Sequence, residues 1–251
     1  MNNSLPKSVQ LQFMRPAQLE AAMRKFPAVY VPFGLIEWHG RHLPLGNDAL
    51  KSHAILVKCA EKFGGVAYPP IYFPSASWGN GVLLEEDIKS KVPMISSLFE
   101  LLKKTGFRVI IGVSGHNIKE QIEMINKALE PVIADHTVAG VGLWEMSLSR
   151  CAESDSDHAA KWETSNMMYF YPELVDLKEL GTKPLAPRMK PPDGIGGLDP
   201  RKHASAKVGE RNVELAIDAI GKKAQELLES LPPDQRSFRL KAISPEYWWQ
   251  I

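Results

Sequence analysis

Short β-branched runs alternate along this chain with longer amphipathic runs, and this alternation limits the folds that are open to it. The runs typical of strands are residues 28–34 (AVYVPFG), 66–73 (VAYPPIYF), 108–115 (RVIIGVSG) and 137–144 (TVAGVGLW). Helical spacing of apolar residues is found between them, in residues 49–63, 88–105 and 119–135. Because strands that alternate with helices favour a parallel sheet covered on both faces, the sequence predicts a three-layer α/β/α fold with a mostly parallel sheet.

The remainder of the chain is consistent with a single domain over residues 1–251. A Pro/Gly-rich segment, residues 181–200, cannot form a long regular element, because proline lacks an amide donor and glycine favours turns. The segment is also too apolar for a plain linker. A helix-like stretch at residues 203–231 follows it without the shift in composition that would mark a second domain.

The overall charge narrows the classes of partner. Lys and Arg total 30 and Asp and Glu total 29, which gives a formal net charge of +1. This balance argues against a general polyanion binder such as a nucleic-acid-binding protein, and it favours a small-molecule partner. The sequence shows no secretion-signal pattern and no run near the roughly 18 apolar residues of a membrane span, so we expect a cytoplasmic protein that does not enter membranes.

The cysteine content excludes two kinds of site. The chain has only Cys59 and Cys151, which is too few for a disulfide framework or a cysteine-rich metal site. A pair of unconnected thiols also fits a reducing compartment. We expect both to be structural thiols and not catalytic ones.

Charged and imidazole side chains gather where the predicted strands end, which is where open α/β sheets bind their ligands. Glu37, His39, His42 and Asp48 follow the first strand and His116 follows the third. Glu37 and His39 are two residues apart, so in an extended segment their side chains project to the same side. Asp48 opens a helix, where an aspartate often serves only as a cap. Beside imidazoles at a strand end, however, a carboxylate is typical of a catalytic Zn or Mn site, and an aspartate can bridge two metals.

A further pair lies in the segment DHAAKWETS. His158 and Glu163 are five residues apart, about 140° around an ideal helix, so one straight helix cannot present both on one face. If a helix begins near Ala159 or Ala160, Glu163 lies in its first turns with His158 just before it, and both can point into one cleft. The alternative is a surface helix whose Glu163 only interacts favourably with the helix dipole. A lone histidine such as His116 can likewise be purely structural.

The segments PFGLIEWHGRHLPLGNDAL, GVSGHN, DHAAKWETS and GLDPRKHASAKVGE together resemble the creatininase family over residues 25 to 230 or so, in the family's order. The resemblance implies two divalent metals per chain, of Zn, Mn or Fe. It implies metal binding by Glu37, His39, Asp48 and His116, with Asp48 as the bridging ligand. Glu163 matches a family glutamate that acts as a further ligand or as a base beside the metals, and His158 matches the catalytic histidine.

One position departs from creatininase itself. Creatininase has a glutamate two residues after the histidine of the second motif, where it completes one metal site, whereas this chain has Ile118. An isoleucine cannot ligate a metal. The difference weakens the case for creatinine as the substrate and for a fully occupied second metal position.

The first functional interpretation is a metal-dependent amidohydrolase that cleaves a non-peptide C–N bond, in a linear or cyclic amide or a formamide, with a metal-activated water and with His158 carrying the proton. Creatinine hydrolysis, formamidopyrimidine-type deformylation and peptide trimming all occur among proteins that the chain resembles, and the sequence does not choose among them. The alternative is a non-catalytic, metal-stabilised binding or assembly protein on the same scaffold. A nucleotide-dependent oxidoreductase is disfavoured, because no G-x-G-x-x-G follows the first strand.

Two expectations concern surfaces. The apolar character of residues 181–200 and of the C-terminal PEYWWQI predicts a homo-oligomer, for which the resemblance suggests a hexamer. A long irregular segment inside a compact domain is usually functional, so we also expect residues 181–200 to cover the mouth of the metal site.

Overall fold

A parallel sheet forms the centre of the molecule. The computed structural model describes residues 5–74, 85–149 and 157–238. Within them the strands are β1 (Ala28–Ile36), β2 (Val66–Ala67), β3 (Ile71–Pro74), β4 (Val109–Ser114) and β5 (Ala139–Trp144). β1 pairs with β2 and β3 on one side and with β4 on the other, β4 pairs with β5, and all of these pairings are parallel.

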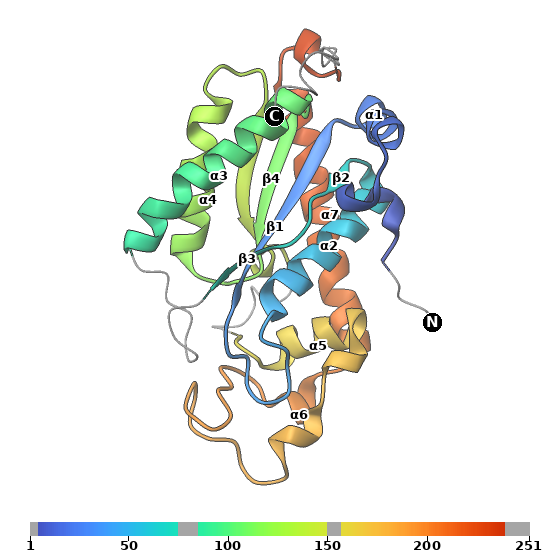
Figure 1. Ribbon diagram of the computed structural model, residues 1–251. Coiled ribbons are helices and arrows are strands. Elements are labelled where there is room, and N and C mark those ends of the chain that lie inside the picture. The colour runs from blue at the N-terminus through green and yellow to red at the C-terminus, as the bar shows by residue number, and fades with distance from the viewer. Residues whose placement is uncertain (1–4, 75–84, 150–156, 239–251) are drawn as a thin grey trace.

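Helices cover both faces of this sheet (Figure 1). The α-helices are α1 (Pro16–Lys25), α2 (Asn47–Phe63), α3 (Glu85–Thr105), α4 (Lys119–Ile133), α5 (Lys161–Phe170), α6 (Pro200–His203) and α7 (Ala206–Ser230). Short 3₁₀ helices lie at Lys7–Val9, Leu11–Phe13, Met146–Leu148, Pro172–Leu174, Leu177–Leu180 and Pro233–Gln235. None of the described helices is long and apolar enough to cross a membrane.

Alternate residues of the strands enter two separate apolar cores. Val29, Phe33 and Ile110 face α3 and α4, in a cluster that includes Phe99 and Ile125. On the other face, Tyr30, Val109 and Ile111 pack with side chains of α2 and α7. β1 is buried over eight consecutive residues, because a parallel sheet with two covered faces has no solvent side. The predicted three-layer α/β/α fold is therefore confirmed.

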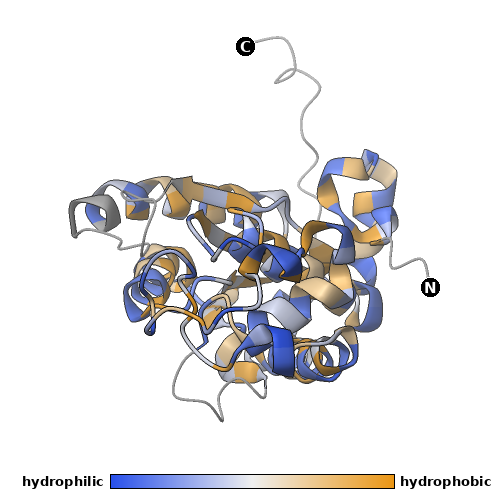
Figure 2. Ribbon diagram, turned by 90° about the horizontal axis from the view of Figure 1, so that it is seen from below, coloured by the Kyte–Doolittle hydropathy of each residue, from blue (hydrophilic) through white to orange (hydrophobic). Residues whose placement is uncertain are grey.

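Hydropathy follows the same arrangement. Figure 2 shows the molecule from below the view of Figure 1, and there the helical ribbons carry both hydrophilic and hydrophobic stretches. This pattern is expected of helices that pack one face on a sheet and leave the other in water.

The prediction of a single strand over residues 66–73 is wrong. The segment forms β2 and β3, both paired with β1, and Pro69 and Pro70 lie between them. A proline has no amide hydrogen to donate to a neighbouring strand, so two consecutive prolines interrupt the ladder. The other predicted strands, and the three helices between them, agree with the structure to within three residues at each end.

The helix expected over residues 203–231 begins later than predicted. α6 ends at His203, and α7 begins at Ala206 after Ser205, whose hydroxyl accepts a hydrogen bond from the amide of Val208 at 3.2 Å. Serine is a favoured residue at this capping position, which accounts for the new start. Residues 181–199 contain no helix or strand, as expected from their prolines and glycines.

One of the two cysteines lies in the core. Cys59 is a buried free thiol of α2, in the cluster that α2 shares with α7. Burial raises the pKa of this thiol to about 12, which disfavours the reactive thiolate and fits a structural role. Cys151 lies outside the described residues.

Candidate metal centre

Three strands end at one edge of the sheet, and each is followed by a buried acidic or imidazole side chain. Glu37 comes directly after β1, Glu145 directly after β5, and His116 two residues after the last residue of β4. Phe33 pairs with Ser114, so the ends of β1 and β4 are adjacent. The carboxyl edge of the sheet therefore gathers side chains able to bind a ligand.

The first turn of α2 lies directly against this edge, and two glycines permit the close approach. A Cβ on Gly34 would overlap the backbone nitrogen of Ala49, and a Cβ on Gly115 would overlap the carbonyl oxygen of Asp48. Only glycine leaves room for backbone at such short range. The two glycines thereby place Asp48 between the ends of β1 and β4.

Asp48 does not cap its helix, so the capping interpretation is wrong. The N-cap position of α2 is Gly46, and no side-chain hydrogen bond caps this helix. The carboxylate of Asp48 instead lies between two imidazoles, with Oδ1 at 2.9 Å from Nε2 of His39 and Oδ2 at 3.3 Å from Nδ1 of His116. One oxygen directed to each imidazole is the geometry of a carboxylate that can bridge two metals.

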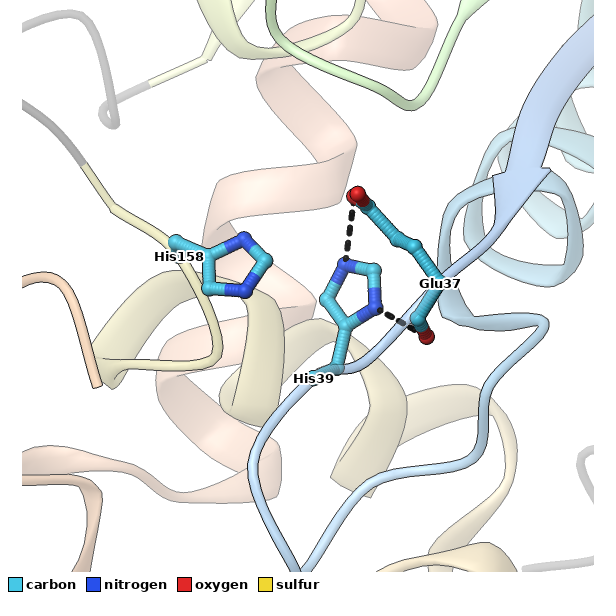
Figure 3. A group of neighbouring side chains, drawn as sticks. All are labelled: Glu37, His39 and His158. Carbon is cyan, nitrogen blue, oxygen red and sulfur yellow. Dashed lines mark hydrogen bonds and ion pairs between the residues drawn. The ribbon is translucent and has the colours of Figure 1, made fainter. Parts of the chain in front are cut away.

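Glu37 and His39 point into the same buried space (Figure 3). Oε1 of Glu37 lies 2.9 Å from Nδ1 of His116 and 3.7 Å from Nε2 of His39. Nδ1 of His39 is 3.3 Å from the carbonyl oxygen of Glu37. In a neutral ring this contact assigns the proton to Nδ1, which leaves the lone pair of Nε2 available to a metal.

The fifth predicted ligand, Glu163, lies in the first turn of α5. Its Oε2 lies 3.7 Å from Nε2 of His39 and accepts a hydrogen bond from the amide of Ala159 at 2.7 Å. Glu163 is 2% exposed, so the alternative of a surface helix is wrong. α5 begins at Lys161, with Ala160 as its N-cap, close to the predicted start.

His158 lies just before α5, and its ring packs against the ring of His39. The two rings, drawn in Figure 3, have centres 4.6 Å apart with 26° between their planes. Nε2 of His158 lies 3.0 Å from the carbonyl oxygen of Trp38. Burial lowers the pKa of His158 from its usual value, which favours the neutral ring. The contact with Trp38 then assigns the proton to Nε2 and leaves Nδ1 as a proton acceptor.

The predicted ligands form two groups of three that share Asp48. One is Glu37, Asp48 and His116, and the other is His39, Asp48 and Glu163, with the ligand atoms of each group within 4.8 Å of one another. A third group, of Glu37, His39 and His158, overlaps them. Oε2 of Glu37 is buried and makes no hydrogen bond to any residue that the structure describes. Carboxylates and imidazoles are the donors that Zn and Mn prefer, so the residues fit a pair of divalent metals.

Two neighbouring residues belong to none of the metal-binding groups found among the described residues. Ile118, at the position where creatininase has a glutamate, packs against the apolar cluster under α3 and α4. His42 is buried, and its Nε2 lies 2.9 Å from the hydroxyl of Thr164. Burial lowers the pKa of His42 to about 4, so it is a neutral structural histidine.

Protonated histidines balance the carboxylates when metal is absent. Burial by itself lowers the pKa of His39, but the charges of Asp48 and Glu163 outweigh burial and raise it to about 9. For His116, burial is likewise outweighed by the contacts with Asp48 and Glu37, and the pKa rises to about 10. A metal that binds these imidazoles displaces their protons, so metal affinity decreases as the pH is lowered.

The sequence reasoning missed three buried residues of the centre. Asp157 accepts hydrogen bonds from the amides of Trp162 at 3.0 Å and Glu163 at 2.9 Å, and so holds the start of α5.

The other two missed residues are Lys51 and Glu145. Lys51 lies 2.7 Å from both Glu145 and Glu163. Burial lowers the pKa of Lys51, but these two carboxylates outweigh burial and keep it well above its usual value. Both residues could have been found from their positions in the sequence. Glu145 directly follows a strand, and Lys51 is three residues after Asp48 in α2.

The segment of residues 181–200 contacts the loops that carry His39 and His158. Gly196 and His158 exchange two backbone hydrogen bonds, of 3.0 and 2.8 Å, and a Cβ on Gly194 would overlap the ring of Trp38. Arg41 and Asp193 form an ion pair of 2.7 Å. The segment is therefore fixed beside the centre, on the side of His158.

Two characterised enzymes are similar to this chain over most of its length. A creatinine amidohydrolase of Pseudomonas putida is 25% identical over 244 residues, covering 81% of this chain and 89% of the relative. A mycofactocin precursor peptide peptidase of Mycolicibacterium smegmatis is 29% identical over 211 residues, covering 74% of this chain and 79% of the relative.

Solved structures share the fold. A crystal structure of creatinine amidohydrolase (creatininase) superimposes with a TM-score of 0.73 at 22% identity, over 88% of this chain and 99% of the other. Similar creatininase structures include a manganese form, a Zn–Zn form of a mutant and a mutant complexed with creatine. The family model of creatininase, described as creatinine amidohydrolase, matches residues 12–223, from before α1 into α7. Since this match spans most of the chain and contains every residue of the candidate centre, the chain belongs to the creatininase family.

Proposed function

We propose that this protein is a metal-dependent amidohydrolase that cleaves a C–N bond of a small linear or cyclic amide or a formamide. The observation that carries the proposal is Asp48, whose two carboxylate oxygens face two buried groups of ligands. The Mn and Zn–Zn forms of related creatininases support a pair of such metals. Both curated relatives are hydrolases, one of creatinine and one of a peptide, so the choice of a non-peptide substrate is part of the proposal.

The side chains divide the work of amide hydrolysis among them. Divalent metals held by these residues would supply a water of lowered pKa and would polarise the carbonyl of the amide. Glu37, His116 and His39 are fixed by burial and by mutual contacts, so the ligand set is preorganised. His158, neutral and with Nδ1 free of its proton, accepts a proton there and delivers it to the departing nitrogen.

A substrate screen tests this function. The metal-free protein is reconstituted with Mn²⁺ or Zn²⁺ and assayed against lactams, formamides, linear amides, creatinine and short peptides. We expect turnover of at least one non-peptide amide that stops when a chelator removes the metals. Turnover of peptides alone would contradict the proposed substrate class. Metal-dependent stability without turnover of any class would favour the alternative of a binding or assembly protein.

The segment of residues 181–200 is proposed to influence substrate choice. Ile195 is 4% exposed and belongs to the core, whereas Leu198 is 53% exposed and lies two residues after Gly196, which is bonded to His158. We expect Leu198→Ser to raise KM or to change the preference between amides, with metal content unchanged. Leu215→Ser, at an exposed leucine of α7, is the matched control. Kinetics of Leu198→Ser equal to those of the control on several substrates would leave the segment without a role in the site.

We further propose that the chain forms a homo-oligomer, with a hexamer suggested by the family. Large apolar side chains are exposed on the described surface, among them Phe13, Met94 and Leu101, whereas the C-terminal PEYWWQI lies outside the described residues. A monomer rarely exposes much contiguous apolar area. Light scattering is expected to give a mass several times 28.0 kDa, and a value near 28.0 kDa would refute this assembly.

A further inference from the structure

A buried lysine lies directly behind the candidate metal ligands. Lys51 follows Asp48 by three residues in α2, so the two side chains lie on neighbouring positions of one helix face. The side chain of Lys51 is completely buried. Its Nζ donates a hydrogen bond to Oε1 of Glu163 at 2.7 Å and forms an ion pair with Oε1 of Glu145, also at 2.7 Å.

The two oxygens of Glu163 have different partners. Oε1 accepts a hydrogen bond from Nζ of Lys51. Oε2 accepts a hydrogen bond from the amide of Ala159 and faces Nε2 of His39. The terminal torsion of a free glutamate side chain is broad, so a carboxylate without partners samples many orientations. Because each oxygen accepts a hydrogen bond, the plane of this carboxylate is fixed, and Oε2 is directed toward His39.

Glu145 is a second buried carboxylate beside the ammonium group of Lys51. The single positive charge of Lys51 is shared between the two carboxylates, each 2.7 Å from Nζ. A purely structural element at this position would be expected to be apolar, since a packed apolar group is often as stabilising as a buried ion pair. Lys51 thus has a geometry suited to support a ligand.

We propose that Lys51 is a positioning residue, which holds Glu163 so that Oε2 completes the metal site formed with His39 and Asp48. The inference rests on the proposed metal-dependent function and extends it to a residue that does not touch metal or substrate. Glu163 is the third member of this group, so its orientation decides whether the site binds tightly.

The test is the affinity of each metal site in Lys51→Met, a variant that keeps most of the side-chain volume and removes the donor. Mn²⁺ and Zn²⁺ binding to the metal-free protein is followed by calorimetry, and Co²⁺ absorption reports the coordination of each site. We expect the site of His39 and Glu163 to weaken by about 10–100-fold, the range seen when a partner of a metal ligand is lost. The site of Glu37 and His116 should stay close to the parent. Parent affinity at both sites would overturn the proposal.

Two control variants separate positioning from stability. Glu145→Gln retains an oxygen that can accept from Lys51, so both metals should bind as in the parent. Ile55→Ala, one turn further along α2 in the apolar core, should lower the melting temperature of the metal-free protein without changing either metal affinity. Equal weakening of both metal sites in all three variants would show that stability alone is involved and would refute the role of Lys51.

A Lys51→Met protein that does not fold and a parent protein that binds fewer than two metals have different consequences. If Lys51→Met does not fold, Lys51→Met/Glu145→Gln carries the same test, because it leaves no unpaired charge at Glu145. A parent that binds fewer than two metals contradicts the proposed metal centre itself. A parent with two metals, together with an unaffected Lys51 variant, contradicts only the role of Lys51.

Discussion

Replacing Asp48 by asparagine is expected to remove at least one metal per chain and to abolish hydrolysis. The change keeps the volume of the side chain but removes the charge that lies between His39 and His116. Since Asp48 belongs to both groups of ligands, its loss affects both metals. We expect the fall in kcat/KM to exceed the roughly 10–100-fold that follows the loss of a hydrogen-bonding partner of a ligand.

Elemental analysis of purified Asp48→Asn, together with circular dichroism, checks this prediction. Asp135→Asn makes the same chemical change at an exposed aspartate beyond α4, and it should keep both metals and full activity. Folded Asp48→Asn with the metal stoichiometry of the parent would refute Asp48 as a ligand.

Replacing His158 by alanine is expected to slow turnover by about 10²–10⁴-fold, the usual contribution of a positioned acid or base. His158 packs on the ring of His39 and is bonded to the carbonyl of Trp38, so we assign it proton transfer and not metal binding. The loss should therefore appear in kcat, with both metals retained.

The matched control for this variant is His53→Ala. His53 is also buried, in α2, but belongs to none of the metal-binding groups among the described residues. Its loss should leave kcat near that of the parent. A His158→Ala protein that purifies without metal would show that His158 is a ligand, and our division of roles would be wrong.

The layered fold could be predicted because its signal is local. Alternating strand and helix runs determine a parallel sheet almost by themselves. The rule that ligands bind at strand ends pointed to Glu37, His39, His42, Asp48 and His116, and the family resemblance then implied metal binding by all of these except His42. The Pro69–Pro70 interruption was also visible in the sequence, but the apolar character of residues 66–73 outweighed it in our interpretation.

The supporting residues were not predictable in the same way. A lysine in an amphipathic helix is usually exposed, and only the approach of Glu145 and Glu163 from distant segments explains why Lys51 is buried. A helix cap remained open as the alternative for Asp48, because the close packing permitted by Gly34 and Gly115 is a tertiary feature. The sequence thus indicated the candidate ligands, whereas the contacts that orient them depend on segments far apart in the chain.

The central claim is that Asp48 joins two metal sites in one buried centre. A crystal structure of the metal-loaded protein, with anomalous diffraction data collected at the Mn or Zn absorption edge, tests it most directly. We predict two anomalous peaks per chain, one beside Glu37 and His116 and one beside His39 and Glu163, each within bonding distance of one oxygen of Asp48. A single peak, or two peaks of which one is not bound by Asp48, would contradict the claim.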